Sequence, residues 1–207
     1  DGRIPLESGI VVPAYRLPTE AEWEFAAQAL LGTQWLEEMQ THQRVYPWDG
    51  HALRNPYGKQ MGYFLANFKR GRGDYAGIAG RLNDGALITS YIYEFPPNDY
   101  GLYNMAGNVS EWVMDVYRPM SFQDVDDLNP MRRDGFLDDV KGYNSNSVEN
   151  PQGFTSLITD KSRVYKGGSW KDVAYWMSPG TRRYLDQDSS TATIGFRCAM
   201  IRAGSNY

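Results

Sequence analysis

The most informative segment of the sequence, from Pro97 to Trp112, reads Pro-Asn-Asp-Tyr-Gly-Leu-Tyr-Asn-Met-Ala-Gly-Asn-Val-Ser-Glu-Trp. Side chains that carry carboxamide or carboxylate oxygens alternate here with apolar side chains. The oxygen-bearing residues are Asn98, Asp99, Asn104, Asn108 and Glu111. Buried apolar neighbours would hold these oxygens in place, which is typical of a rigid loop around a hard cation.

Two interpretations of this segment stay open on composition alone. Calcium takes about six to eight oxygen ligands from side chains and backbone carbonyls, and Gly101 and Gly107 would let the backbone turn its carbonyls inward. The spacing is not that of an EF-hand loop. A turn-rich connector explains the same residues, because Asn and Asp side chains commonly accept hydrogen bonds from their own backbone.

The totals indicate one globular domain. The chain has 207 residues, is 42% hydrophobic and contains six Trp and fifteen Tyr, enough for a sizeable core. No run approaches the roughly 18 apolar residues of a membrane span, and the first residues lack the features of a signal peptide. We expect the chain to be a C-terminal fragment of a longer protein.

Cysteine, histidine and charge exclude several classes of function. Cys198 is the single cysteine, so the chain has no internal disulfide, and His42 and His51 argue against a zinc site or a Ser-His-Asp triad. Residues 115 to 160 hold nine acidic and four basic residues and carry −5, whereas the remainder, with 16 acidic and 17 basic residues, carries +1. The chain therefore offers no broad basic face for nucleic acid.

The N-terminal part predicts a helix that starts after Thr19. Thr19 is the expected N-cap, and Glu22 completes a capping box three residues later. The apolar residues then repeat at three- and four-residue spacing, and Gly32 is the expected stop. The predicted buried stripe consists of Trp23, Ala26, Ala27, Leu30 and Leu31. A second helix is predicted from Gln34 to Gln43.

The second half contains a predicted insertion followed by two strands. Residues 119 to 162 are rich in Asp, Asn, Ser and Gly and keep no regular period, which indicates a long acidic loop and a candidate partner-binding segment. Residues 163 to 170 predict a strand broken by the pair Gly167-Gly168, where another backbone can approach. Alternation from Ile194 to Met200 predicts a half-buried strand with Cys198 pointing inward.

Three separated signatures resemble the formylglycine-generating-enzyme (sulfatase-modifying factor) family. They are Tyr15-Arg16-Leu17-Pro18-Thr19-Glu20-Ala21-Glu22-Trp23-Glu24, the segment from Tyr100 to Trp112, and Lys166-Gly167-Gly168-Ser169-Trp170 with Gly195-Phe196-Arg197-Cys198. The resemblance covers nearly the whole chain apart from the acidic insertion. It implies an irregular α+β fold, a variant of the C-type-lectin fold with little regular secondary structure.

The resemblance also implies two structural calcium ions. One would be held by the side chains of Asn104 and Glu111 and the carbonyls of Gly107 and Val109, which we call the Glu111 set. The other would be held by the side chains of Asn67 and Asp84 and the carbonyls of Phe68 and Ala86, which we call the Asp84 set.

The chemistry of the family is not expected in this chain. The family oxidises a cysteine of a substrate protein with two copper-binding cysteines at the second and seventh positions after the Gly-Gly-Ser-Trp signature. Asp172 and Met177 occupy these positions here. A carboxylate and a thioether cannot form a bis-thiolate copper site, so we expect no copper. Relatives that form carbon–sulfur bonds use histidine-ligated iron, which two histidines in one short segment do not supply.

A narrower resemblance is to the gliding-motility lipoproteins of the Bacteroidota, to GldJ more than to its paralogue GldK. It rests on residues 65 to 80, residues 162 to 172 and Tyr175-Trp176. It implies a non-catalytic structural or interaction component of the gliding and type IX secretion machinery, with other proteins of that machinery as partners. It also implies a location on the periplasmic face of the outer membrane, with attachment only through an N-terminal lipid outside this chain.

Two other functions remain open at this point. An enzyme with altered chemistry could use a carboxylate beside two guanidiniums in the former groove, with Asp172, Arg182, Arg183 and Tyr184 available. Such a cluster is more often an ion-paired structural element than an acid–base pair. A glycan or peptidoglycan binder could stack sugars on exposed Trp and Tyr.

Overall fold

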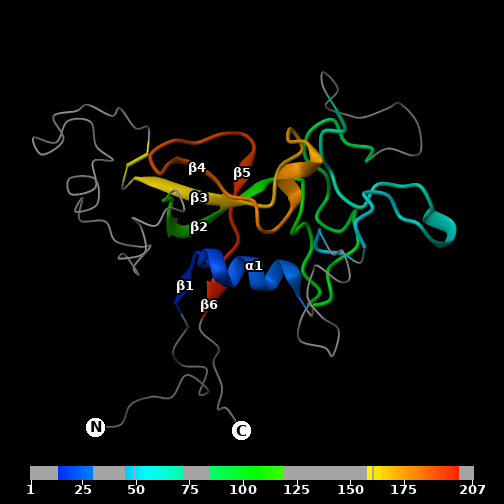
Figure 1. Cartoon of the computed structure of the whole chain (residues 1–207), viewed down its shortest axis with the longest axis horizontal. Coiled ribbons are helices and arrows are strands. Elements are labelled where there is room, and N and C mark those ends of the chain that lie inside the picture. The colour runs from blue at the N-terminus through cyan, green and yellow to red at the C-terminus, as the bar shows by residue number, and fades with distance from the viewer. Residues whose placement is uncertain are drawn as a thin grey trace, which may run out of the picture.

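The computed structural model describes residues 14–29, 45–48, 50–71, 84–118, 158–159 and 161–200. Within these ranges it contains one α-helix, six short strands and two 3₁₀ turns. The sheet lies against the helix, and long irregular segments gather at one side of the molecule (Figure 1). The prediction of a mixed helix and sheet fold with little regular structure is confirmed.

Helix α1 (Glu20–Gln28) begins as the sequence predicts. Thr19 Oγ1 accepts from the backbone N–H of Glu22, and the Glu22 carboxylate accepts in turn from the backbone N–H of Thr19, which completes the capping box. Trp23 and Ala27 are buried. The predicted stop at Gly32 is wrong, because the helix ends at Gln28 and Ala29 turns to a positive φ of 54°.

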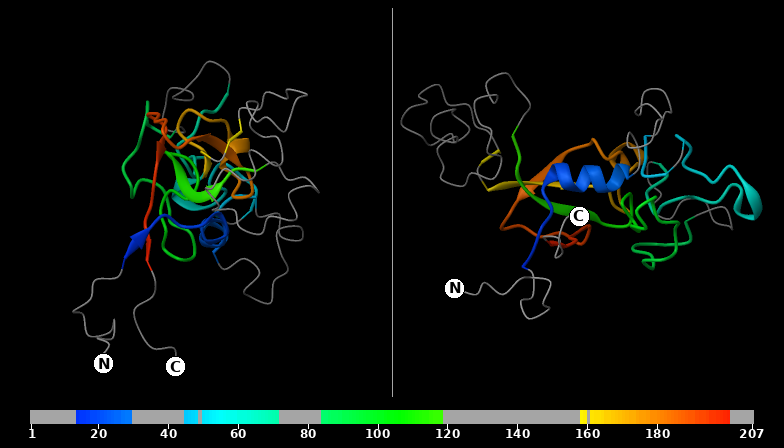
Figure 2. Two further views of the ribbon diagram at one scale, coloured as in Figure 1. Left: turned by 90° about the vertical axis from the view of Figure 1, so that its left-hand side faces the viewer. Right: turned by 90° about the horizontal axis from the view of Figure 1, so that it is seen from below.

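The main sheet has the strand order β4-β3-β2-β5. Its strands are β2 (Ser110–Val116), β3 (Ser162–Lys166), β4 (Arg183–Asp186) and β5 (Ile194–Gly195). β3 pairs antiparallel with β2 and β4, and β5 adds to β2 in parallel. Every residue of β3 is buried, and this strand lies inside the sheet between β4 and β2, with α1 beside the sheet (Figure 2).

A second, two-stranded sheet joins the ends of the described chain. It pairs β1 (Tyr15–Arg16) antiparallel with β6 (Ala199–Met200). The predicted alternation from Ile194 to Met200 is present, but its inward face is wrong. Phe196, Cys198 and Met200 are exposed, whereas Arg197 turns inward to the buried carboxylate of Glu111. An ion pair therefore decides which face points inward, against the apolar pattern.

Two apolar clusters form the core. The first lies between α1 and the main sheet and contains Trp23, Ala27, Met105, Val113 and Val164. The second lies under the irregular segments and contains Phe64, Ala66, Phe68, Ala106 and Met177.

The Gly pair after β3 permits the close backbone approach that the sequence predicts. Gly167 and Gly168 both have a positive φ. A Cβ at Gly168 would lie 3.0 Å from the carbonyl oxygen of Trp176, so the two backbones touch there. A Cβ at Gly167 would lie 3.1 Å from the indole ring of Trp23. Glycine is needed at both positions for these approaches.

Several predicted elements lie outside the described residues. They are Leu30 and Leu31 of the predicted buried stripe, the helix from Gln34 to Gln43, and residues 119–157 and 160 of the acidic insertion. The predicted end of the insertion at residue 162 is wrong, because β3 begins at Ser162. Within the described part, none of the helices has the length and apolar character needed to cross a membrane.

Candidate functional site

The two positions at which the resemblance places the family's copper cysteines lie on either end of a short turn. Asp172 follows the Gly-Gly-Ser-Trp signature, and Met177 closes the 3₁₀ turn η4 (Ala174–Met177). Met177 is fully buried in the second core cluster against phenylalanine and alanine side chains. Its thioether therefore acts as core packing.

The carboxylate of Asp172 accepts hydrogen bonds from Ser169 and Arg183. Its Oδ2 accepts from the backbone N–H of Ser169 at 3.0 Å and from the Ser169 hydroxyl. Its Oδ1 accepts from Nη1 of Arg183. The Arg183 guanidinium lies 4.7 Å from the ring centroid of Trp176 and 5.0 Å from that of Tyr165, so aromatic faces hold it in place.

The predicted pair of guanidiniums beside Asp172 is only half formed. Arg182 points away and donates to Glu20 at 2.7 Å and to the carbonyl of Arg118 at 3.2 Å. Tyr184 stacks on Tyr117 with ring centroids 4.4 Å apart. Asp172 and Arg183 thus form a structural ion pair, which links the segment after the Gly-Gly-Ser-Trp signature to β4. A carboxylate with all these partners and a thioether inside an apolar core do not fit a bis-thiolate copper centre.

The Glu111 set lies around the start of β2. Glu111 is 6% exposed as a residue, and its carboxylate accepts from the indole N–H of Trp23 at 2.7 Å and from Nη2 of Arg197 at 2.6 Å. Nε of Arg197 donates to Oε2 of Glu111, and Nη2 of Arg197 also donates to the carbonyl of Tyr103 at 3.1 Å. A guanidinium thus already balances this carboxylate. For this reason the Glu111 set fits a divalent cation poorly.

The Asp84 set fits a hard cation better. Asn67 is 1% exposed and Asp84 is 6% exposed. The Oδ1 atom of Asn67 is buried and accepts no hydrogen bond, which is costly for a polar atom unless a cation or water satisfies it. The Oδ1 atom of Asp84 accepts from the backbone N–H of Ala86 at 3.2 Å, which folds this segment back on itself. Calcium at this place would supply charge balance for the Asp84 carboxylate.

The two sets meet at Gly107. This glycine has a φ of 75°, and a Cβ on it would lie 2.4 Å from the carbonyl oxygen of Asn67. The backbone N–H of Asn108 donates to that same carbonyl at 2.8 Å. The turn from Asn104 to Asn108, with positive φ at both asparagines, therefore packs directly on the segment that carries Asn67.

The alternative interpretation of the segment 97–112 as a turn holds for two of its asparagines. Asn98 Oδ1 accepts from the backbone N–H groups of Tyr100 and Leu102, and its Nδ2 donates to Ala26 in α1. Asn108 Oδ1 accepts from the backbone N–H of Ser90 at 2.9 Å. Both carboxamides satisfy backbone groups.

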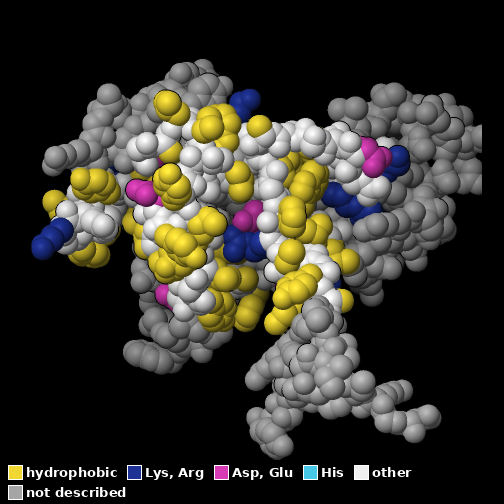
Figure 3. All heavy atoms as spheres, turned by 180° about the vertical axis from the view of Figure 1, so that it is seen from behind, with side chains coloured by type: hydrophobic (Ala, Val, Ile, Leu, Met, Phe, Trp, Pro, Cys, Tyr) yellow, Lys and Arg dark blue, Asp and Glu magenta, His cyan; other side chains and the backbone are white. Residues whose placement is uncertain are grey.

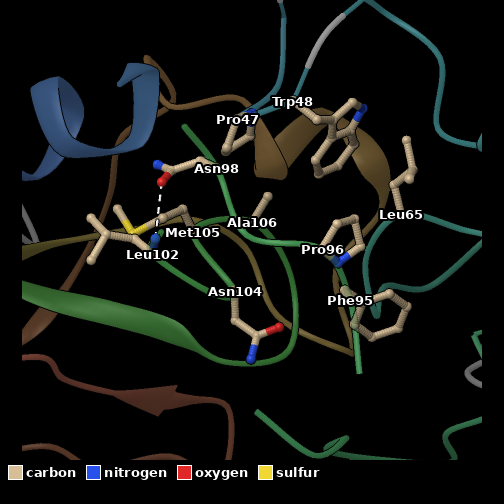
Figure 4. Close-up of a pocket in the computed structure, with 10 residues that line it drawn as sticks. All are labelled: Pro47, Trp48, Leu65, Phe95, Pro96, Asn98, Leu102, Asn104, Met105 and Ala106. Carbon is tan, nitrogen blue, oxygen red and sulfur yellow. Dashed lines mark hydrogen bonds between the residues drawn. The ribbon is translucent and has the colours of Figure 1, made fainter. Parts of the chain in front are cut away.

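A small pocket lies beside this turn, between aromatic, proline and asparagine side chains (Figure 4). Its volume of about 10 Å³ admits no more than one water molecule. It is lined by Pro47, Trp48, Leu65, Phe95, Pro96, Asn98, Leu102, Asn104, Met105 and Ala106. The pocket is a packing gap and no ligand site.

A buried charge network behind α1 was not predicted. Lys166 is fully buried, and its Nζ contacts Glu20 at 3.0 Å and also Glu24, while Nε of Arg182 contacts the same Glu20 oxygen at 2.7 Å. Nothing in the sequence indicated these pairs, because their members are more than 140 residues apart. The acidic residues of α1 also had a sufficient explanation in the helix dipole.

Comparison with known proteins points to one family. The model of the sulfatase-modifying factor enzyme 1-like domain matches residues 3–202. The chain is 32% identical over 187 residues to the formylglycine-generating enzyme of Mus musculus, covering 89% of this chain and 38% of that enzyme. It is 31% identical over 190 residues to the inactive C-alpha-formylglycine-generating enzyme 2 of Mus musculus, covering 89% of this chain and 42% of that protein.

A solved structure supports the fold. Treponema denticola variable protein 1 superposes with a TM-score of 0.50 at 24% identity, covering 91% of this chain and 48% of that one. The chain thus spans less than half the length of each of these three proteins.

Proposed function

Because the chain belongs to the sulfatase-modifying factor enzyme 1-like family, we propose that it is a non-catalytic member that keeps the fold as a structural and interaction domain. The proposal rests on the surroundings of Asp172 and Met177, the residues expected at the two copper-binding positions. Asp172 is held by Arg183 and Ser169, and Met177 lies inside the core. The related protein of Mus musculus named as an inactive paralogue indicates that this family contains members without the activity.

The process in which the domain works is proposed from its resemblance to the gliding-motility lipoproteins. We propose a component of the gliding and type IX secretion machinery on the periplasmic face of the outer membrane. Its partners would be other proteins of that machinery, and its lipid anchor would lie outside this chain. Deletion of residues 119 to 157 together with a pull-down of purified machinery proteins tests whether the acidic insertion carries the contact. Unchanged binding would move the interface to another face.

Calcium is proposed as a structural ion. The Asp84 set is favoured over the Glu111 set, because Asn67 offers a buried oxygen that accepts no hydrogen bond whereas Glu111 is paired with Arg197. The ion would tie the segment after Asp84 to the core segment that carries Asn67.

The competing function is an enzyme, and it is favoured by the named activity of the 32%-identical relative. A thiol peptide incubated with the chain, copper and oxygen separates the two. The scaffold proposal expects no oxidation above the rate with copper alone. Turnover that an Asp172→Ala variant abolishes would overturn it.

A glycan binder is the third candidate, since Tyr175 is 68% exposed and packs edge-on against Trp176. Titration with peptidoglycan fragments, monitored by Trp fluorescence, tests it. A saturable change that Tyr175→Ala removes would favour this function over the scaffold.

A further inference from the structure

The segment from Asp84 to Phe95, which we call the anchored loop, is held to the body of the protein by asparagine side chains. Asn67 Nδ2 donates to the carbonyl of Ile88 at 2.7 Å, and Asn104 Nδ2 donates to that of Ile92 at 3.0 Å. Between them, Asn108 donates to the carbonyl of Ser90 at 3.5 Å and accepts from its N–H at 2.9 Å. Three carboxamides thus bind the backbone at Ile88, Ser90 and Ile92, and the chain turns just beyond, where the N–H of Glu94 donates to the carbonyl of Tyr91 at 3.2 Å.

This arrangement points the backbone polar groups at the protein and leaves apolar side chains outside. Tyr91 is 85% exposed, Tyr93 is 78% exposed and Leu87 is 76% exposed. Ile88 and Ile92 are also exposed. The only ring contact in this group that the described residues show is Tyr93 edge-on to Tyr103.

So many large apolar side chains in one short loop are unusual for a surface that stays in water. Contiguous apolar patches on soluble proteins commonly mark interaction sites. The face seen from behind carries exposed hydrophobic side chains on both sides of a central group of basic and acidic side chains (Figure 3).

The anchored loop borders a cavity, and the charged residues that line this cavity are acidic. A hollow of about 660 Å³ is lined by Asp84, Gly85, Ala86, Leu87, Thr89, Ser90, Tyr91 and Glu94. The volume is in the range of ligand pockets. Both charged lining residues are acidic, and the sequence has no Lys, Arg or His from Leu82 to Tyr117.

We propose that the anchored loop is a docking surface for an extended segment of a partner polypeptide that carries Lys or Arg beside apolar side chains. The apolar side chains pack on Leu87 and Tyr91, and the basic side chain enters the hollow toward Glu94 and the face of Tyr91. Charge complementarity selects a basic occupant, because the carboxylate of Glu94 is exposed here and the described residues that line the hollow include no Lys, Arg or His. The inference rests on the proposed interaction function and locates one of its contacts.

A random peptide library displayed on phage and selected on the purified chain tests the proposal. Selected peptides are expected to combine Lys or Arg with Leu, Ile or aromatic residues. The best synthetic peptide is expected to lose about tenfold or more in affinity for a Tyr91→Ser variant, as interface tyrosines often do. Glu94→Gln is expected to weaken binding and to reduce its dependence on salt, because one charge pair is removed.

Matched variants control for general surface effects. Tyr57, directly before the 3₁₀ turn η2 (Gly58–Gln60), is 79% exposed, close to the 85% of Tyr91. The Tyr57→Ser variant is expected to bind the peptide as the wild type does. Circular dichroism checks that each variant folds. Selection of acidic peptides, absence of any enrichment, or equal binding by Tyr91→Ser would each overturn the proposal.

A membrane is the other surface that apolar side chains could meet. Flotation with phosphatidylcholine vesicles that Tyr91→Ser abolishes would assign the loop to lipid and overturn the peptide proposal. None of these outcomes bears on copper-dependent turnover or on the acidic insertion, so the function proposed above is tested separately.

Discussion

At the scale of single residues, Glu111 connects parts of the chain that are far apart. Its carboxylate accepts from Trp23 in α1 and from Arg197 after β5, with side-chain exposures of 7% for Glu111 and 26% for Arg197. Removing one partner of such a pair leaves the other charge in a poorly solvated place, which costs more than the pair itself contributes.

We therefore expect Glu111→Gln to destabilise the fold by about 2 to 4 kcal/mol, measured by urea unfolding. Asp188→Asn is the matched control, because its pair with Lys161 is exposed on both sides and its loss should leave the unfolding midpoint unchanged. Repeating both measurements with a calcium chelator tests the Glu111 set. A loss that occurs only in the presence of calcium would show that Glu111 acts through a bound ion rather than through Arg197.

Gly107 gives a second test at this scale, since Gly101 has nearly the same backbone conformation in open space. Their φ angles are 75° and 76°, but a Cβ meets the Asn67 carbonyl at 2.4 Å in one case and nothing within 4 Å in the other. We expect Gly101→Ala to cost about 1 kcal/mol from the left-handed backbone alone, and Gly107→Ala to cost more than about 3 kcal/mol. Thermal unfolding of the two variants measures both costs, and equal losses would contradict the close contact.

At the scale of elements, helix α1 and strand β2 are joined by a buried carboxylate. Asp115 Oδ2 accepts from the backbone N–H of Glu20 at 2.6 Å, at the positive end of the helix dipole. Burial raises the pKa of Asp115 above its ordinary value, and the nearby charge of Glu20 raises it further, against the lowering effect of the backbone hydrogen bond and of Arg182.

This direction predicts how stability changes with pH. A carboxyl whose pKa is higher in the folded state binds its proton more tightly there, so ionised Asp115 costs stability at neutral pH. That cost disappears as the pH falls through the folded pKa toward the unfolded value. We expect Asp115→Asn, which keeps an oxygen for the Glu20 N–H, to be at least as stable as the wild type near neutral pH. The difference should shrink toward pH ~4.

Urea unfolding of both proteins across this range measures the effect. Glu22 is the control with the opposite sign, because its hydrogen bond from Arg16 lowers its pKa to about 2. The stability that this half-exposed pair contributes, at most about 1 kcal/mol, is present above the unfolded pKa and is lost as the pH falls toward the folded one. A clear loss of stability for Asp115→Asn near neutral pH would show that the charge on the helix end matters more than burial.

At the scale of the whole molecule, the irregular segments depend on a few polar contacts rather than on sheets. Asn67 contacts the anchored loop, and Gly107 packs on the Asn67 carbonyl. A cation in the Asp84 set would act on all three segments together.

We expect calcium to raise the melting temperature. Binding to the folded state alone adds about 2.7 kcal/mol at a hundredfold excess over the dissociation constant, which corresponds to roughly 5–10 °C for a domain of this size. Differential scanning fluorimetry with calcium and with a chelator measures the shift. Asp84→Asn should remove most of it, whereas Asp99→Asn, which changes a carboxylate outside both sets, should not. An equal shift in both variants would exclude the Asp84 set.

Local sequence determined the features that depend on near neighbours. Thr19 and Glu22 define the start of α1 because a capping box needs only four residues, and Gly167-Gly168 marks the close backbone approach because only glycine tolerates it. The family signatures could also be read from the chain alone, and with them the expectation that Asp172 and Met177 stand at the family's copper-binding positions.

Tertiary structure alone decided which groups meet. Alternation from Ile194 to Met200 suggested an inward Cys198, but the buried carboxylate of Glu111 draws Arg197 inward and turns Cys198 out. The same holds for Lys166 with Glu20 and for the asparagines that hold the anchored loop. Periodicity reports how apolar a face is, whereas a buried charge must find its partner wherever the fold brings one within reach, and that distance is not encoded in spacing along the chain.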